Sequence, residues 1–580
     1  MCGICGLMKS SVDLIDLIKV KKMVKFLSHR GPDGSGIFKN NKLVMLHKRL
    51  SIIDLSGGKQ PIKNNQLVLV ANGEIYNDME LRKNKKDYNY KTKSDSESIL
   101  AVYNRFGISG FEKLRGMYAF AIYDLKENCL ILGRDPFGIK PLYFCLLEDG
   151  FLFSSELQAI TKSQFIKPIM NLKKRNELLA FQFCTGRQTI FNSINRLRPG
   201  EILVVKNNKI IKSKIFNKIK SLKTFQYKKS FVKKKLEETV RLHQRSDVPY
   251  GAFFSGGIDS SLILYFMSII NKKPIKSYSI LFKENKKQTE YLIKLCEKFN
   301  SKLTIVDFTE QDFWNYLPKV AYIMDDPIID YASVPTYKLA SVAKKEVKVV
   351  LTGEGGDELF GGYGRYRNLK KSYLSKGPFN KFKGLSKYLD GFNVSLEFKK
   401  ENINNKNLTK LQKAQFFDFE EWLPNDLLIK LDRCLMAHGI EGRTPFVDTD
   451  LFTNFFLAND RIKIKKKFGK YYIRKFMSEN LDYYNSFEKK KGFTVPMTLW
   501  LPKYKNFFLE VLPKIKCLKN IFPQLEIKKL CLGLGNDKYS VTVVWRLIFF
   551  ALWHSSNIDY NNYNGNTFDI LAILSNENYS

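Results

Sequence analysis

The sequence lacks any apolar run long enough to cross a membrane. Its longest apolar stretches lie at 262–270 and 541–553, and Arg546 interrupts the second. A membrane-spanning helix needs ~20 apolar residues. The first residues, MCGICGLMKSS, have neither the basic leader nor the long apolar core of a secretory signal. We therefore expect a cytoplasmic protein.

Cysteine is scarce and scattered, with nine in 580 residues. An odd number without dense spacing favours reduced thiols over a disulfide framework. Cys2 and Cys5 form a C-x-x-C pair, but no second pair and no nearby histidines complete a zinc ligand set in the sequence. The pair is therefore not interpreted as a metal site.

Acidic residues are few, because 57 Asp and Glu stand against 96 Lys and Arg, which gives a formal net charge of +39. A basic field attracts polyanions, so binding to nucleic acid or to an anionic surface is one interpretation. The lysines form short scattered runs such as 83–86, 232–235 and 465–467, without the interleaved aromatic residues of a single-strand platform. A compositional lysine bias, which accompanies many Asn and Ile residues, is the interpretation we favour.

The length predicts two to four domains, and the 44% hydrophobic content supplies their cores. Up to residue 215 the pattern predicts an antiparallel α+β unit with an amphipathic helix over 96–106, which Ser94 and Glu97 cap as a capping box and Gly107 ends. A tight polar turn makes 117–133 a β-hairpin. The strands predicted here are 67–71, 117–124, 129–133, 151–154 and 201–205.

After residue 215 strands alternate with helical segments. Such alternation predicts a parallel, doubly wound sheet with its ligand site at the carboxyl ends of the strands. The region 366–560 is mostly helical by pattern and should pack around that sheet. The predicted strands are 248–254, 276–282, 303–307 and 347–352.

Cys2 is the first candidate for chemistry. An initiator Met before a small residue is normally removed, which would leave Cys2 with both a thiol and a free α-amine. The α-amine, with an ordinary pKa of ~7.7–8.0, could then take the thiol proton, so that Cys2 would supply its own general base. A buried, inert cysteine is the common alternative.

Seven short motifs of the first half add to this interpretation. Together they resemble the glutaminase domain of the class II glutamine amidotransferases. The resemblance implies an αββα sandwich of the N-terminal-nucleophile type over residues 1–214, which releases ammonia and glutamate through a γ-glutamyl thioester on Cys2. The motifs are MCGICG at 1–6, HRGPDG at 29–34, HKRLSIIDLS at 47–56, NGEIYN at 72–77, SDSE at 94–97, GRDPFGIKPLY at 133–143 and SSE at 154–156.

The resemblance implies a role for each matching residue. Arg49 would clamp the α-carboxylate of glutamine with its guanidinium fork, and Asp95 would accept the α-ammonium group. Asn72 and Gly73 would form the oxyanion hole, where one donor is typically worth ~3–4 kcal/mol. The glutamine site implied in this way consists of Arg49, Leu50, Ser51, Ile52, Ile53, Asn72, Gly73, Glu74 and Asp95.

The heptad SGGIDSS at 255–261 lies between a predicted strand and a predicted helix. Its glycines expose backbone N–H groups, its hydroxyls add donors, and a helix N-terminus favours anions. It lacks the Gly-Lys-Ser/Thr of the loop that transfers a γ-phosphoryl group. Instead it resembles the pyrophosphate loop of enzymes that split ATP into AMP and pyrophosphate. The resemblance implies ATP as a co-substrate, bound by Phe254, Ser255, Gly256, Gly257, Asp259, Ser260, Ile280, Thr352 and Gly353.

A second strand of this half ends in LTGEGGDELFGGYGRY at 351–366. Hard cations prefer carboxylate oxygens, so Asp259 and Asp357 are the expected ligands of Mg²⁺ on the pyrophosphate. Glu354, at the same strand end, is the candidate to position an acyl-adenylate or to relay a proton from ammonia. Structural glycine turns with solvated acids are the alternative.

Two later segments, DRCLMAHGIEGRTPFVD at 432–448 and KKKGFTVP at 489–496, resemble the closing part of an asparagine synthetase domain. Lys490 matches the lysine that neutralises charge as pyrophosphate leaves, with Lys489 and Lys491 as the neighbouring alternatives. The segment 439–443 is assigned no catalytic role.

From residue 2 to about 500 the motifs together resemble the glutamine-hydrolysing asparagine synthetase family. The resemblance implies a carbon–nitrogen ligase with an ATP-pyrophosphatase domain over 215–565, an α/β domain with helical additions. It implies small-molecule substrates, a homodimer, and ammonia that passes through an internal apolar channel to an acyl-AMP made from aspartate.

The acceptor stays open at this point. Tyr331 stands where well-known asparagine synthetases carry an arginine suited to the aspartate α-carboxylate. The form GGDELFGGYGRY at 355–366 also resembles bacterial amidotransferases of polysaccharide clusters, which would amidate a uronic-acid carboxylate. A basic RNA-binding or tRNA-modifying protein with a pyrophosphate loop is the alternative from another class, and the intact glutaminase set argues against it.

Overall fold

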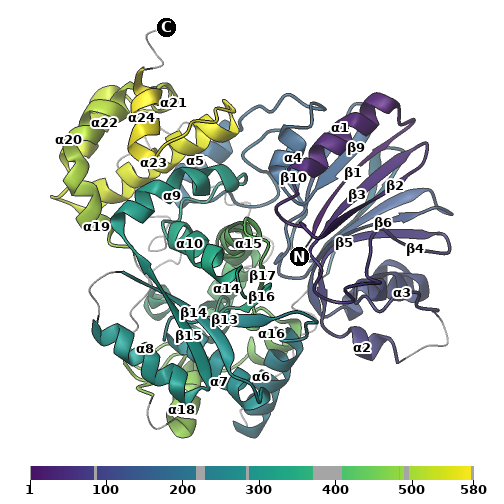
Figure 1. The fold of residues 1–580 in the computed structure, drawn as a ribbon, viewed down its shortest axis with the longest axis horizontal. Helices are drawn as coiled ribbons and strands as arrows, with labels where there is room; N and C mark the ends of the chain where they lie inside the picture. The colour runs from purple at the N-terminus through teal and green to yellow at the C-terminus, as the bar shows by residue number, and fades with distance from the viewer. Residues whose placement is uncertain are drawn as a thin grey trace.

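The computed structural model describes residues 2–83, 88–216, 229–282, 286–369, 408–481, 484–488 and 495–576. Its first half is built on two six-stranded antiparallel sheets, and its second half on a parallel sheet with many helices (Figure 1). Strand β12 ends at Ile215, and the next described element, helix α6 (Lys229–His243), begins the second half. The boundary between residues 214 and 215 stays a prediction.

The two antiparallel sheets pack face to face, and apolar side chains from both fill the space between them. Ile4 and Met45 of one sheet and Val70 and Leu132 of the other share this core. In sheet order the strands are β10 (Ile194–Arg196), β8 (Tyr143–Leu147), β9 (Gly150–Ser154), β1 (Gly3–Lys9), β3 (Leu43–Arg49) and β2 (Gly34–Lys39), then β12 (Lys209–Ile215), β11 (Glu201–Lys206), β7 (Cys129–Arg134), β6 (Gly116–Asp124), β5 (Leu67–Ile75) and β4 (Ile62–Asn64).

Helices cover the outer faces of this sandwich. Along β5, Val68 and Val70 face the space between the sheets, whereas Leu69 and Ala71 join the cluster under helix α3 (Glu97–Phe106). Helix α1 (Leu14–Lys25) packs against β1 and β3 on the other side. The expected αββα sandwich is therefore confirmed, as is the hairpin of β6 and β7.

Helix α3 forms where amphipathicity predicts it and ends at Gly107, whose φ is +59°. The predicted capping box of Ser94 and Glu97 is wrong. Ser96 is the residue before the helix, so Glu97 occupies the first helical position instead of the third. Its carboxylate accepts hydrogen bonds from the Thr92 N–H and hydroxyl, both at 2.7 Å, and so holds the preceding loop.

The second half contains the predicted parallel sheet, with Glu441–Arg443 as a fifth strand that the sequence pattern did not predict. The order is β15 (Ser301–Phe308), β14 (Ile275–Phe282), β13 (Tyr250–Phe253), β16 (Val349–Leu351) and β17 (Glu441–Arg443). Alternate side chains of β16 enter different cores, Val349 and Leu351 on one face and Val350 on the other, so the sheet is doubly wound. Its connecting helices include α7 (Ile258–Ile270), α8 (Lys286–Lys298), α9 (Glu310–Ile323) and α10 (Ser333–Ala343).

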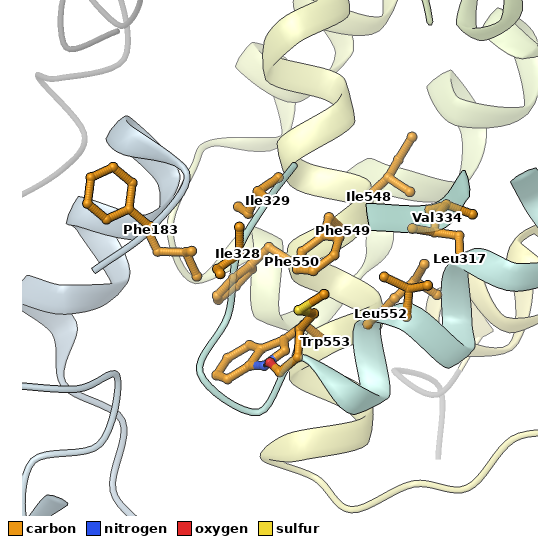
Figure 2. Close-up of a cluster of buried hydrophobic side chains, with 14 of the residues drawn as sticks. Phe183, Leu317, Ile328, Ile329, Val334, Ile548, Phe549, Phe550, Leu552 and Trp553 are labelled. Carbon is orange, nitrogen blue, oxygen red and sulfur yellow. The ribbon is translucent and has the colours of Figure 1, made fainter. Parts of the chain in front are cut away.

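Helix α23 (Lys538–Asn557) is the centre of the C-terminal helical part. Its buried Ile548, Phe549 and Leu552 lie beside Leu317 of α9 and Val334 of α10 (Figure 2). Around it stand the shorter helices α5 (Leu172–Phe181), α20 (Lys505–Val511), α22 (Gln524–Leu532) and α24 (Thr567–Asn576). Within the described ranges, no helix combines the length and apolarity that crossing a membrane requires.

The two halves share a hydrophobic core. Leu50 and Met117 of the sandwich belong to one cluster with Phe446 of the second half. The ring of Phe137 lies 5.5 Å from that of Phe419 and 5.3 Å from that of Phe452. This interface places the strand ends of the parallel sheet beside the sandwich.

We expect the substitution Trp553→Ala to destabilise the helical part strongly. Trp553 is fully buried, and its indole N–H donates to the Met324 carbonyl at 2.9 Å. Truncation leaves a cavity that costs about 3–5 kcal/mol of the free energy of unfolding. Chemical denaturation followed by tryptophan fluorescence and circular dichroism would measure the loss. Trp553→Phe, which keeps most of the ring volume, should cost clearly less, and equal losses would contradict this account.

Candidate functional site

Cys2 stands at the entrance to strand β1 and is buried. Its backbone N–H donates to Asn72 Oδ1 at 3.0 Å, and its carbonyl accepts from Arg30 Nε at 3.1 Å. The sulfur lies 4.0 Å from the Leu50 carbonyl oxygen. The main chain on both sides of the thiol is therefore fixed by side chains from other strands and loops.

Asn72 and Gly73 are consecutive residues of strand β5, which passes beside Cys2. Asn72 is fully buried, and among the described residues its Nδ2 has no hydrogen-bond partner. Gly73 adopts φ +157°, and a Cβ there would lie 2.1 Å from the Met117 carbonyl oxygen, so only glycine fits. A free amide donor next to a thiol can stabilise an oxyanion that forms when the thiol attacks an amide.

The electrostatics favour a protonated thiol at neutral pH. Burial raises the pKa of Cys2 above its ordinary value, and the negative charge of Glu441 adds to that rise. Attack by Cys2 therefore needs a base that removes the thiol proton.

Arg49 is the last residue of strand β3, and Asp95 lies shortly before helix α3. The Arg49 guanidinium donates to the Leu55 carbonyl at 3.1 Å and to the Asp54 carbonyl at 2.6 Å, which holds the loop that contains Ser51, Ile52 and Ile53. Asp95 is buried, and its Oδ2 accepts from the Ile75 N–H at 2.7 Å. Burial raises the pKa of Asp95 to about 6. Its neighbour Glu74 is also buried.

The SGGIDSS segment connects β13 to the N-terminus of helix α7. Gly256 has φ +71°, and Gly257 is the residue before the helix. The hydroxyls of Ser255 and Ser260 lie 3.2 Å apart. Glycine backbone, two hydroxyls and the N-terminus of a 13-residue helix converge here, which is the donor set that a phosphate group needs. Phe254 is buried beneath the loop.

The GEGGD loop packs directly against this segment. A Cβ at Gly353 would lie 2.9 Å from Asp259 Cβ, and one at Gly356 would lie 2.5 Å from Asp259 Oδ1. The Thr352 N–H donates to the Arg443 carbonyl at 2.9 Å. Ile280 lies on the neighbouring strand β14. The predicted ATP residues are thus brought together at the carboxyl ends of adjacent strands.

Lys470, which sequence reasoning missed, lies between the two predicted metal ligands. Its ammonium contacts Asp259 Oδ2 and lies 2.9 Å from Asp357 Oδ1. Although burial opposes the change, the two carboxylates raise the pKa of Lys470. Lys470 is more than 100 positions from both aspartates, and no motif in the sequence marks it.

The two carboxylates of Asp259 and Asp357 can bind Mg²⁺ only if other groups supply the remaining ligands. Among the described residues, Asp259 Oδ1 has no hydrogen-bond partner, and no group of three acidic, histidine or cysteine residues is arranged to hold a metal ion. Asp259 and Asp357 would hold the cation, with phosphate oxygens as further ligands. When bound, Mg²⁺ would neutralise phosphate charge.

Glu354 lies at the end of β16, and no described residue donates a hydrogen bond to it. Its charge acts on Lys430, whose ammonium lies 2.7 Å from Asp330 Oδ2. Lys490, with Lys489 and Lys491, lies outside the described residues.

A family model described as "Asparagine synthase" matches residues 232–555, and one described as "Glutamine amidotransferase domain" matches residues 1–216. The first covers more than half of the chain. The chain belongs to the asparagine synthase family. Within this family the chain carries an N-terminal glutamine amidotransferase domain, followed by the asparagine synthase domain.

Curated relatives match most of the chain. Asparagine synthetase [glutamine-hydrolyzing] 1 of Bacillus subtilis is 30% identical over 96% of this chain and 97% of its own length. Asparagine synthetase B of Escherichia coli is 30% identical over 77% of this chain and 73% of its own length. A solved structure, the "allosteric regulatory enzyme of purine biosynthesis", covers 53% of this chain and 80% of its own with 14% identity and a TM-score of 0.29, which is too low to support an argument.

We expect Lys470→Met to destabilise the second site. The substitution leaves the carboxylates of Asp259 and Asp357 close together without the ammonium that contacts both of them. The free energy of unfolding should fall by as much as about 3 kcal/mol, because a charge without its partner is costly where it is largely buried.

Chemical denaturation at neutral pH would measure this loss. Lys475→Met, on helix α18 (Tyr471–Asn480) that follows Lys470, removes an exposed lysine and should have no effect. Equal stability of Lys470→Met and the unchanged protein would contradict the assignment.

Proposed function

We propose that this member of the asparagine synthase family transfers nitrogen from glutamine to an adenylated carboxylate, with aspartate as the acceptor. Glutamate, asparagine, AMP and pyrophosphate would be the products. The observation that carries the proposal is the unpartnered Asn72 Nδ2 beside the buried Cys2, together with a phosphate-binding loop in the same chain.

In the first reaction, the Cys2 sulfur attacks the side-chain carbonyl of glutamine. The α-amine exposed by removal of Met takes the thiol proton and passes it to the departing nitrogen. Asn72 Nδ2 and the Gly73 N–H would donate to the oxyanion. Arg49 and Asp95 would bind the α-carboxylate and α-ammonium groups, and water then hydrolyses the thioester to glutamate.

In the second reaction, a carboxylate oxygen of the acceptor attacks the α-phosphorus of ATP and pyrophosphate departs. The loop at Ser255–Ser260 would hold the pyrophosphate, with Lys470 and Lys490 as the cations that compensate its charge. Ammonia then attacks the acyl carbon and AMP leaves. Glu354 would take the excess proton from the attacking nitrogen.

Ammonia must cross the interface between the two halves to reach the acyl-AMP. In bulk water it would be protonated and lost as a nucleophile. The shared cluster of Leu50, Met117 and Phe446 supports a dry route, because apolar side chains from both halves exclude water there.

Aspartate as the acceptor is supported by the pair of Asp330 and Lys430. The pair supplies one charge of each sign within electrostatic reach of Glu354, as the α-ammonium and α-carboxylate groups of an amino acid require. Tyr331 packs towards Trp545, with ring centroids 6.4 Å apart. The missing arginine at this position is the observation that keeps a uronic-acid carboxylate as the second candidate.

Purified protein with ATP, Mg²⁺ and glutamine, and either aspartate or a nucleotide-linked uronate, tests the acceptor. We expect AMP and asparagine with aspartate, and AMP formation that depends on aspartate. AMP only with the uronate would favour the second candidate. ADP as the product, or glutamate release that requires added RNA, would contradict the proposal.

Cys2→Ala should abolish the use of glutamine and leave synthesis from added ammonium intact. The reason is that Cys2 acts only in the release of ammonia, and the carboxylate is activated elsewhere. Glutamate release and AMP formation, measured side by side with glutamine or ammonium chloride, check this division. Cys5→Ala, which removes a buried thiol of the same strand, is the matched control. Loss of ammonium-dependent synthesis in folded Cys2→Ala would refute the division.

The use of glutamine should fall steeply below pH 6. Asp95 has a pKa of about 6 because it is buried, so it is ionised above this pH and loses its attraction for the glutamine ammonium as the pH falls. The kcat/KM for glutamine should decrease towards about tenfold per pH unit on the acid side. The variant Asp95→Asn should be slower, and its kcat/KM should not fall at this pH. If the fall near pH 6 persists in the variant, another group is responsible for it.

A further inference from the structure

Arg443 is the last residue of strand β17, at the edge of the parallel sheet. The strand pairs with β16, where Arg443 lies opposite Leu351. The Arg443 side chain is fully buried at the interface between the two halves. Nothing in the reactions described above uses this guanidinium.

The guanidinium makes contacts in both halves. Nε donates to Glu441 Oε1 at 2.6 Å, and Nη2 donates to Glu74 Oε2 at 3.3 Å. Nη1 donates to the carbonyls of His243 at 2.9 Å and Arg245 at 2.6 Å. Glu74 directly follows Gly73, so Arg443 is anchored to the strand that carries the proposed oxyanion hole.

The backbone of Arg443 supports the ATP site. Its carbonyl accepts from the Thr352 N–H at 2.9 Å and from the Thr352 hydroxyl at 3.4 Å. Gly353, which follows Thr352 in the chain, packs against Asp259. A single residue therefore connects the proposed oxyanion strand to the proposed ATP loop.

Two buried carboxyl groups, those of Glu441 and Glu74, lie next to the Arg443 guanidinium. Glu441 and Glu74 are both buried, and among the described residues Glu74 Oε1 has no hydrogen-bond partner. Burial opposes ionisation of Glu441, yet Arg443 is the foremost of the cations that lower its pKa to about 2. Burial raises the pKa of Glu74, and Arg443 opposes that rise. The charge of Glu441 also reaches the Cys2 thiol.

Removal of this cation would leave the buried Glu441 carboxylate without its foremost counter-ion and would take a hydrogen-bond donor from Glu74. A buried charge without a partner is costly, and it recruits water or a proton. Water admitted beside Glu441 would lie close to Cys2, where ammonia is proposed to form. The route to the acyl-AMP would then be open to protonation and leakage.

We propose that Arg443 is a positioning residue that couples the two reactions. It compensates the charge of Glu441 and donates a hydrogen bond to Glu74, which keeps the interface dry, and it holds Thr352 in register with strand β5. The inference rests on the proposed function, because coupling has meaning only if the chain both hydrolyses glutamine and forms AMP.

The test compares Arg443→Gln with Arg115→Gln. Arg115 also spans the interface, with Nε 2.9 Å from Asp448 Oδ2 and Nη1 3.1 Å from Glu238 Oε1, but no contact links it to Glu74 or Thr352. Glutamate formed per AMP would be measured with saturating glutamine, ATP, Mg²⁺ and the acceptor that supports AMP formation.

Arg443→Gln should raise the ratio of glutamate to AMP by about threefold or more, because ammonia escapes into admitted water. Arg115→Gln should keep the ratio of the unchanged protein. Arg443→Lys retains the cation but cannot reach all four acceptors, so its ratio should lie between the two. Thermal unfolding checks that each variant is folded.

The outcomes separate this inference from the proposed function. A folded Arg443→Gln with an unchanged ratio, even with slower turnover, would show that Arg443 only supports the fold. If Arg443→Gln does not fold, Arg443→Lys decides in the same way, and an unchanged ratio there overturns the inference. Failure of the unchanged protein to form either glutamate or AMP would instead contradict the proposed function.

Discussion

The buried contacts between arginines and carboxylates at the interface are the constraint on which both sites depend. Arg30 is fully buried, with Nη1 2.6 Å from Glu156 Oε1 and 2.7 Å from Asp432 Oδ2, while its Nε holds the Cys2 carbonyl. The removal of one partner from such a group costs ~3–5 kcal/mol, because a charge is left buried and unpaired. The position of the thiol at the start of the chain therefore depends on a carboxylate of the second half.

The interface also contains apolar contacts between the two halves. The rings of Phe137, Phe419 and Phe452 pack within one cluster. Apolar burial of this kind is non-directional, whereas the guanidinium groups demand specific acceptors in specific places. The apolar contacts thus hold the halves together, and the arginines define how they meet.

The two sites differ in how local their construction is. In the proposed glutamine site, Asn72 and Gly73 are consecutive residues of one strand. Their placement requires only that the residue next to the Met117 carbonyl is a glycine. The second site combines two loops at adjacent strand ends with Lys470, which lies far along the chain, directly before a helix. Charge compensation there is consequently a product of tertiary packing.

Much of this protein follows from the sequence alone. The periods of two and 3.6 in its apolar residues predict strands β5, β6, β7, β9 and β11, helix α3 and strands β13 to β16, because those features depend on neighbours in the chain. Glycine-rich motifs mark Cys2, Asn72 and the proposed phosphate loop for the same reason. Short strand β17 carries no such pattern. Only the tertiary structure decided that Lys470 lies between two aspartates and that Arg443 joins Glu74 to Thr352, since these contacts form between segments that only folding brings together.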